Sequence, residues 1–401
     1  MNSKLVIAVD TFMLSDACRN SGTYVYGRNL LREFKKILRE EDNVTIRPFV
    51  DSHGQNSISA SKSGVVQSIG TSGLRHHRWW RLGGATFEAF RAQADLLFSP
   101  SVHVIPLGIV PVVATIHDVM PAVLPSELVP GRTILEAFTR MAAKFSKRIL
   151  TDSEHSKKDL VEVYRLQPDK VKVVYIGYNR EQFNSEPPNS TSLNSLTSRF
   201  GIRAPYLIHH GTVHPRKNLI RLIQAYSLLL RRRVDLDMPL VLAGPLGWRH
   251  ELIQAEAAKL PDRRKVIFTG ALRDADLAQL VKGATLSIIP SLYEGFCLPL
   301  VEAMACRTPT VASEASCIPE ISGRCLRYFD PYNVDQIASV MQEVLEDSDL
   351  RSDLAEKGRR RASHFSWDRC ARETLCELAE VAGVPWSVRT DKNRWPVLKV
   401  E

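Results

Sequence analysis

The residues best suited to chemistry in this chain are two glutamates eight positions apart and two adjacent cations. Glu294 and Glu302 enclose a loop that leads into a helix with a proline in its first turn. Arg216 and Lys217 follow a second glycine-bearing loop, at Gly211. Carboxylates accept hydrogen bonds from sugar hydroxyls, whereas an arginine fork, a lysine and loop N–H groups bind phosphates. Together the two sets predict a site for a nucleotide sugar.

Short apolar runs before both loops predict the strands that position them. Residues 206–209 precede the Gly211 loop, and residues 285–290 precede the Glu294 loop. Helical spacing predicts a helix over 219–230 after the first loop, and good helix formers follow the second loop at 300–305. In an open α/β sheet, loops of this kind form the ligand-facing edge.

The N-terminal half repeats the alternation of strand and helix. Gly22 and Thr23 lie between a first strand at 5–9 and a helix over 24–38. His117 directly follows an expected strand at 112–116, where a ligand of such a sheet would lie. Each position has a plainer alternative: Gly22 and Thr23 can form a simple helix cap, and His117 can be a satisfied core histidine. Further strands are expected at 44–50 and 95–100, from 148, and at 171–177.

Length and composition indicate the class of protein. A chain of 401 residues predicts two domains, and 44% hydrophobic with 24% charged residues is typical of soluble globular proteins. A net charge of +9 is too mild for a nucleic-acid binder, so no nucleic-acid partner is expected, but it suits phosphorylated substrates or an anionic membrane surface. Seven cysteines without CxxC spacing predict reduced thiols. No signal peptide or spanning run is evident. We expect a cytoplasmic protein, soluble or at most peripheral at the cytoplasmic face of the inner membrane.

Segment composition divides the chain. Residues 181–200 are rich in Asn, Ser, Thr and Pro without evident periodicity, which predicts a linker. The expected domains are therefore 1–180 and 201–365, followed by a C-terminal helical segment over 366–401.

The segment 74–82 is dense in cations and aromatic residues. Arg75, Arg78 and Arg81, with Trp79 and Trp80, fit an interfacial patch among lipid headgroups. The alternative is a helix in which Trp79 or Trp80 fills the core while the arginines stay in water.

Metal chemistry is not expected. Three Asp-x-Asp pairs exist, but each lies in a charged turn or near a helix start, where aspartates cap helices or remain solvated; they are 235/237, 274/276 and 347/349. None follows a strand in the way a Mg²⁺ site for a nucleotide sugar would. The sequence therefore predicts no metal and no other cofactor.

Three segments resemble motifs of a known family. Residues 294–309, E-G-F-C-L-P-L-V-E-A-M-A-C-R-T-P, resemble the Glu-x7-Glu signature of the family four retaining glycosyltransferases, E-G-F-G-L-P-x-x-E-A-M-A-x-G-x-P. Cys297 and Arg307 stand where that signature has glycine. Residues 211–218 match the family form G-x-x-x-x-R-K-N, and 115–118 match its Thr-x-His-Asp element. The resemblance extends from Gly22 to Trp367.

The resemblance implies a fold and a set of roles. The fold is GT-B: two Rossmann-like α/β domains facing a cleft, with the C-terminal helix crossing back to the N-terminal domain. The first loop reaches the acceptor and the donor phosphates, the cation pair holds the diphosphate, and Glu302 binds the ribose. The implied catalytic residues are His117, Arg216, Lys217 and Glu294. The implied donor-binding residues are Gly22, Thr23, Gly211, Arg216, Lys217, Leu272 beside the base, Glu294, Gly295, Phe296, Cys297, Leu298 and Glu302.

The implied reaction is transfer of a hexose, with retention, from a nucleoside diphosphate sugar to a hydroxyl of a glycan or lipid-linked saccharide. Resemblance to bacterial mannosyltransferases makes GDP-mannose the first guess, in the synthesis of O-antigen, capsule or exopolysaccharide. Two alternatives remain open. One is a nucleotide-sugar 2-epimerase on the same fold. The other is a catalytically degenerate sugar-nucleotide-binding subunit, conceivable because Cys297 replaces a loop glycine.

Overall fold

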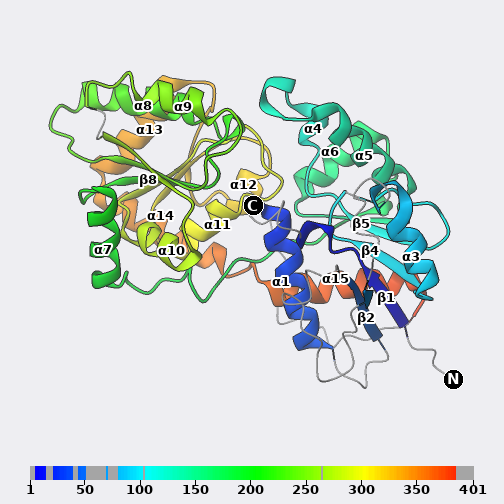
Figure 1. The fold of residues 1–401 in the computed structure, drawn as a ribbon. Coiled ribbons are helices and arrows are strands. Elements are labelled where there is room, and N and C mark those ends of the chain that lie inside the picture. Colours follow the sequence, from blue (N-terminus) through cyan, green and yellow to red (C-terminus); the bar gives the residue numbers. More distant parts are fainter. Residues whose placement is uncertain are drawn as a thin grey trace. The chain divides into compact units, whose positions relative to one another are not determined.

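The computed structural model describes residues 5–14, 21–38, 44–50, 69–70, 80–102, 104–262 and 265–384. They form two compact units, each built on a parallel β-sheet (Figure 1). The described part of unit 1 lies within Met1–Val123, Gly131–Gly177 and Phe365–Trp395. The described part of unit 2 lies within Leu124–Pro130 and Tyr178–His364.

The sheet of unit 1 has the described strand order β3-β2-β1-β4-β5-β6-β7. Its central strands are short and buried along their whole length, as expected for a parallel sheet covered on both faces. The strands are β1 (Leu5–Val9), β2 (Val44–Val50), β3 (Ile69–Gly70), β4 (Leu96–Ser99), β5 (Val112–Thr115), β6 (Arg148–Thr151) and β7 (Val171–Val173). The helices are α1 (Gly22–Ile37), α3 (Ala85–Arg91), α4 (Met120–Val123), α5 (Arg132–Phe145), α6 (Glu154–Tyr164) and α15 (Trp367–Ala382).

Helix α15 returns to unit 1 and packs against α1, which confirms the expected crossing of the C-terminal helix. The side chain of Ser366 caps the helix by accepting a hydrogen bond from the backbone N–H of Arg369 at 3.1 Å. A Cβ atom on Gly177 would lie 2.1 Å from the backbone nitrogen of Trp367. Glycine at 177 therefore lets the end of the β7 segment approach the start of α15.

The sheet of unit 2 has the order β10-β9-β8-β11-β12-β13. In Figure 1, α8, α9 and α13 lie on one side of this sheet and α7, α10, α11 and α14 on the other. The strands are β8 (Leu207–His210), β9 (Leu240–Ala243), β10 (Val266–Gly270), β11 (Leu286–Ile289), β12 (Thr310–Ser313) and β13 (Arg327–Phe329). The helices are α7 (Ser190–Phe200), α8 (Leu219–Arg232), α9 (His250–Ala257), α10 (Asp274–Gly283), α11 (Leu298–Ala305), α12 (Ile318–Ser322), α13 (Val334–Glu346) and α14 (Ser348–Ala362).

The hydrophobic core of unit 2 lies where α8 and α13 cover strands β8, β9 and β11. Leu222 and Tyr226 of α8 pack in one buried cluster with Leu242 of β9 and Met341 of α13. The apolar residues of α8 recur at helical spacing, which is why the helix over 219–230 could be predicted. This packing fixes the first turn of α8 and the loop before it.

The segment 181–200 is not the linker that its composition predicted, because it contains helix α7. The side chain of Asn189 caps this helix by accepting from the backbone N–H of Ser192 at 2.9 Å. Leu193, Leu196 and Phe200 are spaced i, i+3, i+7, so one face of the segment does carry a helical period. α7 packs against α10, and the division between the units falls at Gly177–Tyr178.

Trp80 is not a lipid anchor. Its side chain is fully buried and donates a hydrogen bond to Oδ1 of Asp10 at 3.0 Å, with its ring edge-on to Phe49. The core alternative therefore holds for Trp80. The guanidinium of Arg81 lies 4.1 Å from the ring centre of Phe138. The rest of the expected patch, Arg75, Arg78 and Trp79, lies outside the described residues.

Among the helices of the described ranges, none has the length and apolar character that crossing a membrane requires.

Candidate active site

The cations and the first glutamate meet at the carboxyl edge of the unit 2 sheet. β8 and β11 are neighbouring parallel strands, so the loops that follow them lie side by side. Arg216 and Lys217 belong to a short 3₁₀ turn after β8, and Glu294 belongs to the loop after β11. Nη1 of Arg216 lies 2.9 Å from Oε2 of Glu294, and Nζ of Lys217 is paired with Oε1. One carboxylate thus holds both expected phosphate ligands.

Backbone contacts fix this ion cluster. Nδ1 of His214 accepts from the backbone N–H of Arg216 at 3.2 Å and caps the 3₁₀ turn. The backbone N–H of Leu292 donates to the carbonyl of Arg216 at 3.0 Å, which ties the two loops together. On the far side, the hydroxyl of Ser316 accepts from the backbone N–H of Glu294 at 2.9 Å. These contacts hold together the two loops that carry the three charged side chains.

The cluster is buried and charged. Glu294 and Lys217 are each 5% exposed, whereas the Arg216 side chain is 25% exposed. Burial alone would raise the pKa of Glu294, but the charges of Arg216 and Lys217 and the hydrogen bond from Lys217 lower it to about 2. Glu294 is therefore a carboxylate at neutral pH and cannot act there as a general acid.

Glu302 lies on α11, the helix that follows the Glu294 loop. Its carboxylate is 3.3 Å from Nε2 of His210, the last residue of β8. The neighbouring His209 is also buried, and Nδ1 of its ring is 2.9 Å from the carbonyl of Ile288. Burial lowers the pKa of His209 to about 3, so this ring is neutral. Sequence reasoning missed both histidines, although their place at the end of an expected strand was a signal.

The two residues that replace signature glycines adopt a glycine-like backbone. Cys297 has φ 69° and Arg307 has φ 57°, in the left-handed region that costs L-residues energy. Cys297 is 4% exposed, and burial raises the pKa of its thiol to about 12, so the thiol stays protonated. Helix α11 begins at the next residue, Leu298, with Pro299 in its first turn as the sequence predicted. The loop through Gly295 and Phe296 thus enters α11 through a left-handed residue at 297.

Gly211 and Leu272 lie at the same edge of the sheet. Gly211 has φ 126°. A Cβ atom placed on Gly244 would lie 2.1 Å from the carbonyl oxygen of Gly211. Leu272 follows β10, which is two strands removed from β8. The structure therefore places Leu272 apart from the ion cluster along the edge.

The expected site residues of unit 1 also lie at the carboxyl edge of their sheet. His117 follows β5; its Nδ1 is 2.7 Å from Oδ2 of Asp152, and its Nε2 is 3.3 Å from the carbonyl of Pro100. Gly22 and Thr23 form the first turn of α1, where the hydroxyl of Thr23 is 2.7 Å from that of Ser21, the helix cap. The side chain of Ser21 caps α1 by accepting from the backbone N–H of Tyr24 at 3.2 Å, and a Cβ atom on Gly22 would meet no described atom within 4 Å.

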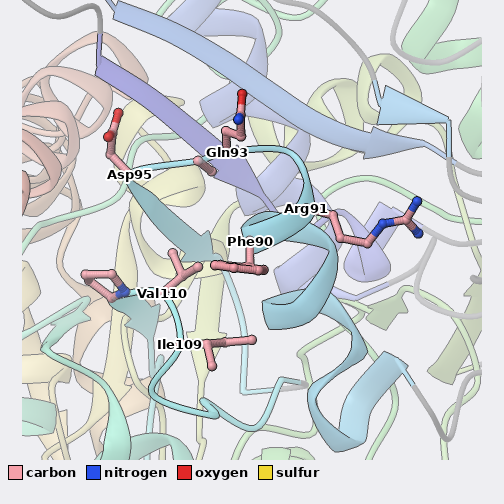
Figure 2. A pocket seen from close by; sticks show the side chains of 8 residues that line it. Phe90, Arg91, Gln93, Asp95, Ile109 and Val110 are labelled. Atoms are coloured by element: carbon pink, nitrogen blue, oxygen red, sulfur yellow. The ribbon is translucent and has the colours of Figure 1, made fainter.

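A surface hollow in unit 1 lies away from these residues. Figure 2 shows it between Phe90 at the end of α3 and Ile109 in the loop before β5. Asp95 and Val110, which also line it, precede β4 and β5. The hollow therefore lies at the amino edge of the sheet, opposite the edge that carries His117.

Four of the six aspartates of the Asp-x-Asp pairs form an ion pair or cap a helix. Asp235 pairs with Arg233, Asp237 with Lys265 and Asp276 with Arg273. Asp347 caps α14 by accepting from the backbone N–H of Leu350 at 2.8 Å. These carboxylates serve helix starts and surface ion pairs, as their sequence context predicted.

The fold is that of the GT-B glycosyltransferases. Anabaena HepE, solved with UDP and glucose, covers 94% of this chain and 100% of its own length with a TM-score of 0.72 and 17% identity. WaaG, a glycosyltransferase involved in lipopolysaccharide biosynthesis, covers 92% of this chain and 98% of its own length with a TM-score of 0.65 and 17% identity.

Family models match most of the chain. The model "Glycosyltransferase Family 4" matches residues 32–182, and "Glycosyl transferases group 1" matches residues 199–361. The chain belongs to the family four glycosyltransferases, and it is therefore an enzyme of the glycosyltransferase class.

Several similar curated proteins are mannosyltransferases. O-antigen chain mannosyltransferase B of Escherichia coli is 27% identical over 72% of this chain and 75% of its own length. The serotype-specific mannosyltransferase WbdA of E. coli is 30% identical over 64% of this chain but only 32% of its own length. The MMP alpha-(1->4)-mannosyltransferase of Mycolicibacterium hassiacum is 33% identical over 59% of this chain and 56% of its own length. This chain thus spans about a third of WbdA and over half of the mycobacterial relative.

Proposed function

We propose that this chain transfers mannose from GDP-mannose to a hydroxyl of a glycan or lipid-linked saccharide during surface polysaccharide synthesis. The ion cluster of Arg216, Lys217 and Glu294 carries the proposal, because it brings together at one edge of the sheet the two cations that a diphosphate requires. The names of the similar proteins from E. coli and M. hassiacum support mannose as the sugar. HepE, the structural neighbour solved with UDP-glucose, makes UDP-glucose the competing donor to test.

The proposed chemistry replaces one bond at the anomeric carbon by another on the same face. The bond to the diphosphate oxygen breaks, the acceptor oxygen bonds to the anomeric carbon, and the acceptor proton passes to the departing diphosphate. Arg216 and Lys217 stabilise the charge that grows on the diphosphate. The partly exposed Arg216 receives the phosphate first, while Lys217 supplies charge from within the cluster.

In this mechanism Glu294 holds both cations in position through its two carboxylate oxygens. Because the cations lower its pKa to about 2, it remains an acceptor for hydroxyls of the donor sugar. Glu302 binds the ribose diol, with His210 behind its carboxylate at 3.3 Å. Retention is part of the proposal, and ¹H NMR of the product linkage tests it.

We propose that transfer needs no metal ion, because the two cations perform the work that Mg²⁺ does in other nucleotide-sugar enzymes. Activity should therefore persist in excess EDTA. If EDTA abolished transfer and Mg²⁺ or Mn²⁺ restored it, the role given to Arg216 and Lys217 would be wrong.

A donor panel tests the function as a whole. Isothermal titration with GDP-mannose, GDP-glucose, UDP-glucose and UDP-GlcNAc identifies the donor, and product analysis with and without a saccharide acceptor identifies the reaction. We expect GDP-mannose to bind best and mannose to appear on the acceptor. An epimerised nucleotide sugar without acceptor would establish the epimerase alternative. Binding without any product would establish the degenerate subunit.

Contact with the inner membrane is part of the proposal, since a lipid-linked acceptor lies there. Its support is the basic excess of the chain and the arginines near residue 75. Trp80 no longer contributes, because it is buried. Co-sedimentation with anionic vesicles should fall when Arg75 and Arg78 are changed to serine. If wild type and variant pelleted equally with the vesicles at low salt, these arginines would not contribute to membrane binding.

A further inference from the structure

His117 is held between the ends of two strands that flank its own. β5, which precedes it, pairs with β4 on one side and with β6 on the other. Pro100 follows β4, and its carbonyl oxygen faces Nε2 of His117. Asp152 follows β6, and its carboxylate pairs with Nδ1 of the same ring. Both ring nitrogens therefore face oxygen acceptors, a pattern that only the doubly protonated ring satisfies at both sites.

Asp152 is built into this position. It is 3% exposed, and its second oxygen, Oδ1, has no hydrogen-bond partner among the described residues. A buried carboxylate requires a compensating positive charge, and the His117 ring at 2.7 Å supplies it. The carbonyl of His117 is also fixed, because the hydroxyl of Ser156 donates to it at 3.2 Å.

We propose that Asp152 is the positioning residue for His117: it holds the imidazole in its cationic form, with Nε2–H as the hydrogen bond that a substrate oxygen takes over. The two hydrogen bonds differ in length, 2.7 Å at Nδ1 and 3.3 Å at Nε2. The longer bond is the weaker one and is the one that can be exchanged. The His117 side chain is 20% exposed, so a phosphate or hydroxyl oxygen can reach it.

The other groups around the ring leave Asp152 as the main source of this effect. Burial opposes protonation of His117, but Asp152, its hydrogen bond, Asp118 and the Pro100 carbonyl together raise the pKa above its usual value. Tyr26 of α1 meets the ring edge-on at 4.7 Å. Cys370 of α15 lies near Asp152. Burial raises the pKa of both Tyr26 and Cys370, so both are neutral near pH 7.

The expected effect on the rate of transfer rests on the proposed function, whereas the effect of Asp152 on the protonation of His117 does not. A cationic donor binds a phosphate or hydroxyl oxygen more strongly than a neutral one. Transfer should therefore decline as pH rises through the His117 pKa. Substituting Asp152→Asn keeps a hydrogen-bond acceptor for Nδ1–H but removes the charge, so it separates orientation from protonation.

The experiment has two readouts on the full chain. NMR titration of the His117 ring, assigned by difference from His117→Gln, measures the pKa in wild type and in Asp152→Asn. We expect a decrease of about 1 unit or more in the variant. The decline of kcat/KM with pH should move to lower pH by the same amount in the variant. At a pH above both pKa values, the variant should therefore be about tenfold slower than the wild type. Asp152→Glu should restore part of the shift.

Asp159→Asn is the matched control, because Asp159 pairs with His155 on α6 at 3.3 Å. It should leave the titration of His117 and the pH profile unchanged. An equal His117 pKa in wild type and Asp152→Asn would overturn the inference, as would an unchanged pH profile. If the wild type transferred no sugar from any donor, the proposed function would fail, while the NMR titration would still decide the role of Asp152.

Discussion

Removing the charge of Lys217 should destabilise unit 2 more than removing any exposed lysine charge. The Lys217→Met substitution keeps most of the side-chain volume but leaves Glu294 buried, at 5% exposure, with Arg216 as its remaining cation. A carboxylate out of water needs compensation that solvent cannot supply at this position. Unfolding should therefore begin at a lower urea concentration in this variant.

The size of the effect follows from how the cluster divides. Breaking a buried ion pair by removing one partner costs about 3–5 kcal/mol. Here Oε2 of Glu294 keeps its contact with Arg216 at 2.9 Å, and only Oε1 loses its partner. We therefore expect a loss at or just below about 3 kcal/mol in the free energy of unfolding. Glu294→Gln should also destabilise, since it leaves two cations without their carboxylate.

The assay is a double-mutant cycle followed by urea denaturation, with one transition fitted for each unit. Lys217→Met, Glu294→Gln and the double variant are compared with wild type. The double variant should lose about 1–3 kcal/mol less than the sum of the single losses, because neither Lys217 nor Glu294 then remains as a buried charge without the other. Lys357→Met, which breaks an exposed pair with Asp353 on α14, is the control and should change the midpoint little. Single losses that add to within about 0.5 kcal/mol would refute the reasoning.

Three further predictions concern the same site. Lys217→Ala should lower kcat by about 10²–10³-fold, because the diphosphate gains charge in the transition state. Glu302→Ala should mainly raise KM for the nucleotide sugar. Steady-state kinetics that showed equal losses of kcat in the two variants would contradict these separate roles. Cys297→Gly should be more stable than Cys297→Ala by about 1–2 kcal/mol, since only glycine relieves the left-handed backbone at 297; equal thermal midpoints would mean that this backbone is unstrained. The pKa of Glu294 is about 2 in the folded state and 4.5 without its partners, so its contribution to stability is present above pH 4.5 and is lost as the pH falls toward 2. The stability of Glu294→Gln should therefore fall less on acidification than that of the wild type. Identical curves of stability against pH would mean that other groups cause the acid destabilisation.

The sequence predicted most strands and where the loops of the candidate site lead into helices. Apolar runs marked the buried strands, and the first turn of α11 began where Pro299 indicated. The segment 181–200 was misread, because its few apolar residues are diluted by Ser and Asn although three of them share a helix face. For Trp80 the sequence left a lipid anchor and a core residue both open, for a related reason. Flanking arginines suggest an interface, but the buried acceptor that its indole requires, Asp10, is seventy positions away in sequence.

Motif spacing by itself determined the family, the glycine-like positions and which residues bear charge, since these depend on contacts within a few residues along the chain. Tertiary structure decided which of those charges meet. Glu294 lies 78 positions from Arg216, and Asp152 lies 35 positions from His117. Each pair forms because two loops leave the same edge of a parallel sheet. The strand order and the burial that shifts the pKa values of these side chains both depend on residues far apart in the chain, so neither could be predicted from local sequence patterns.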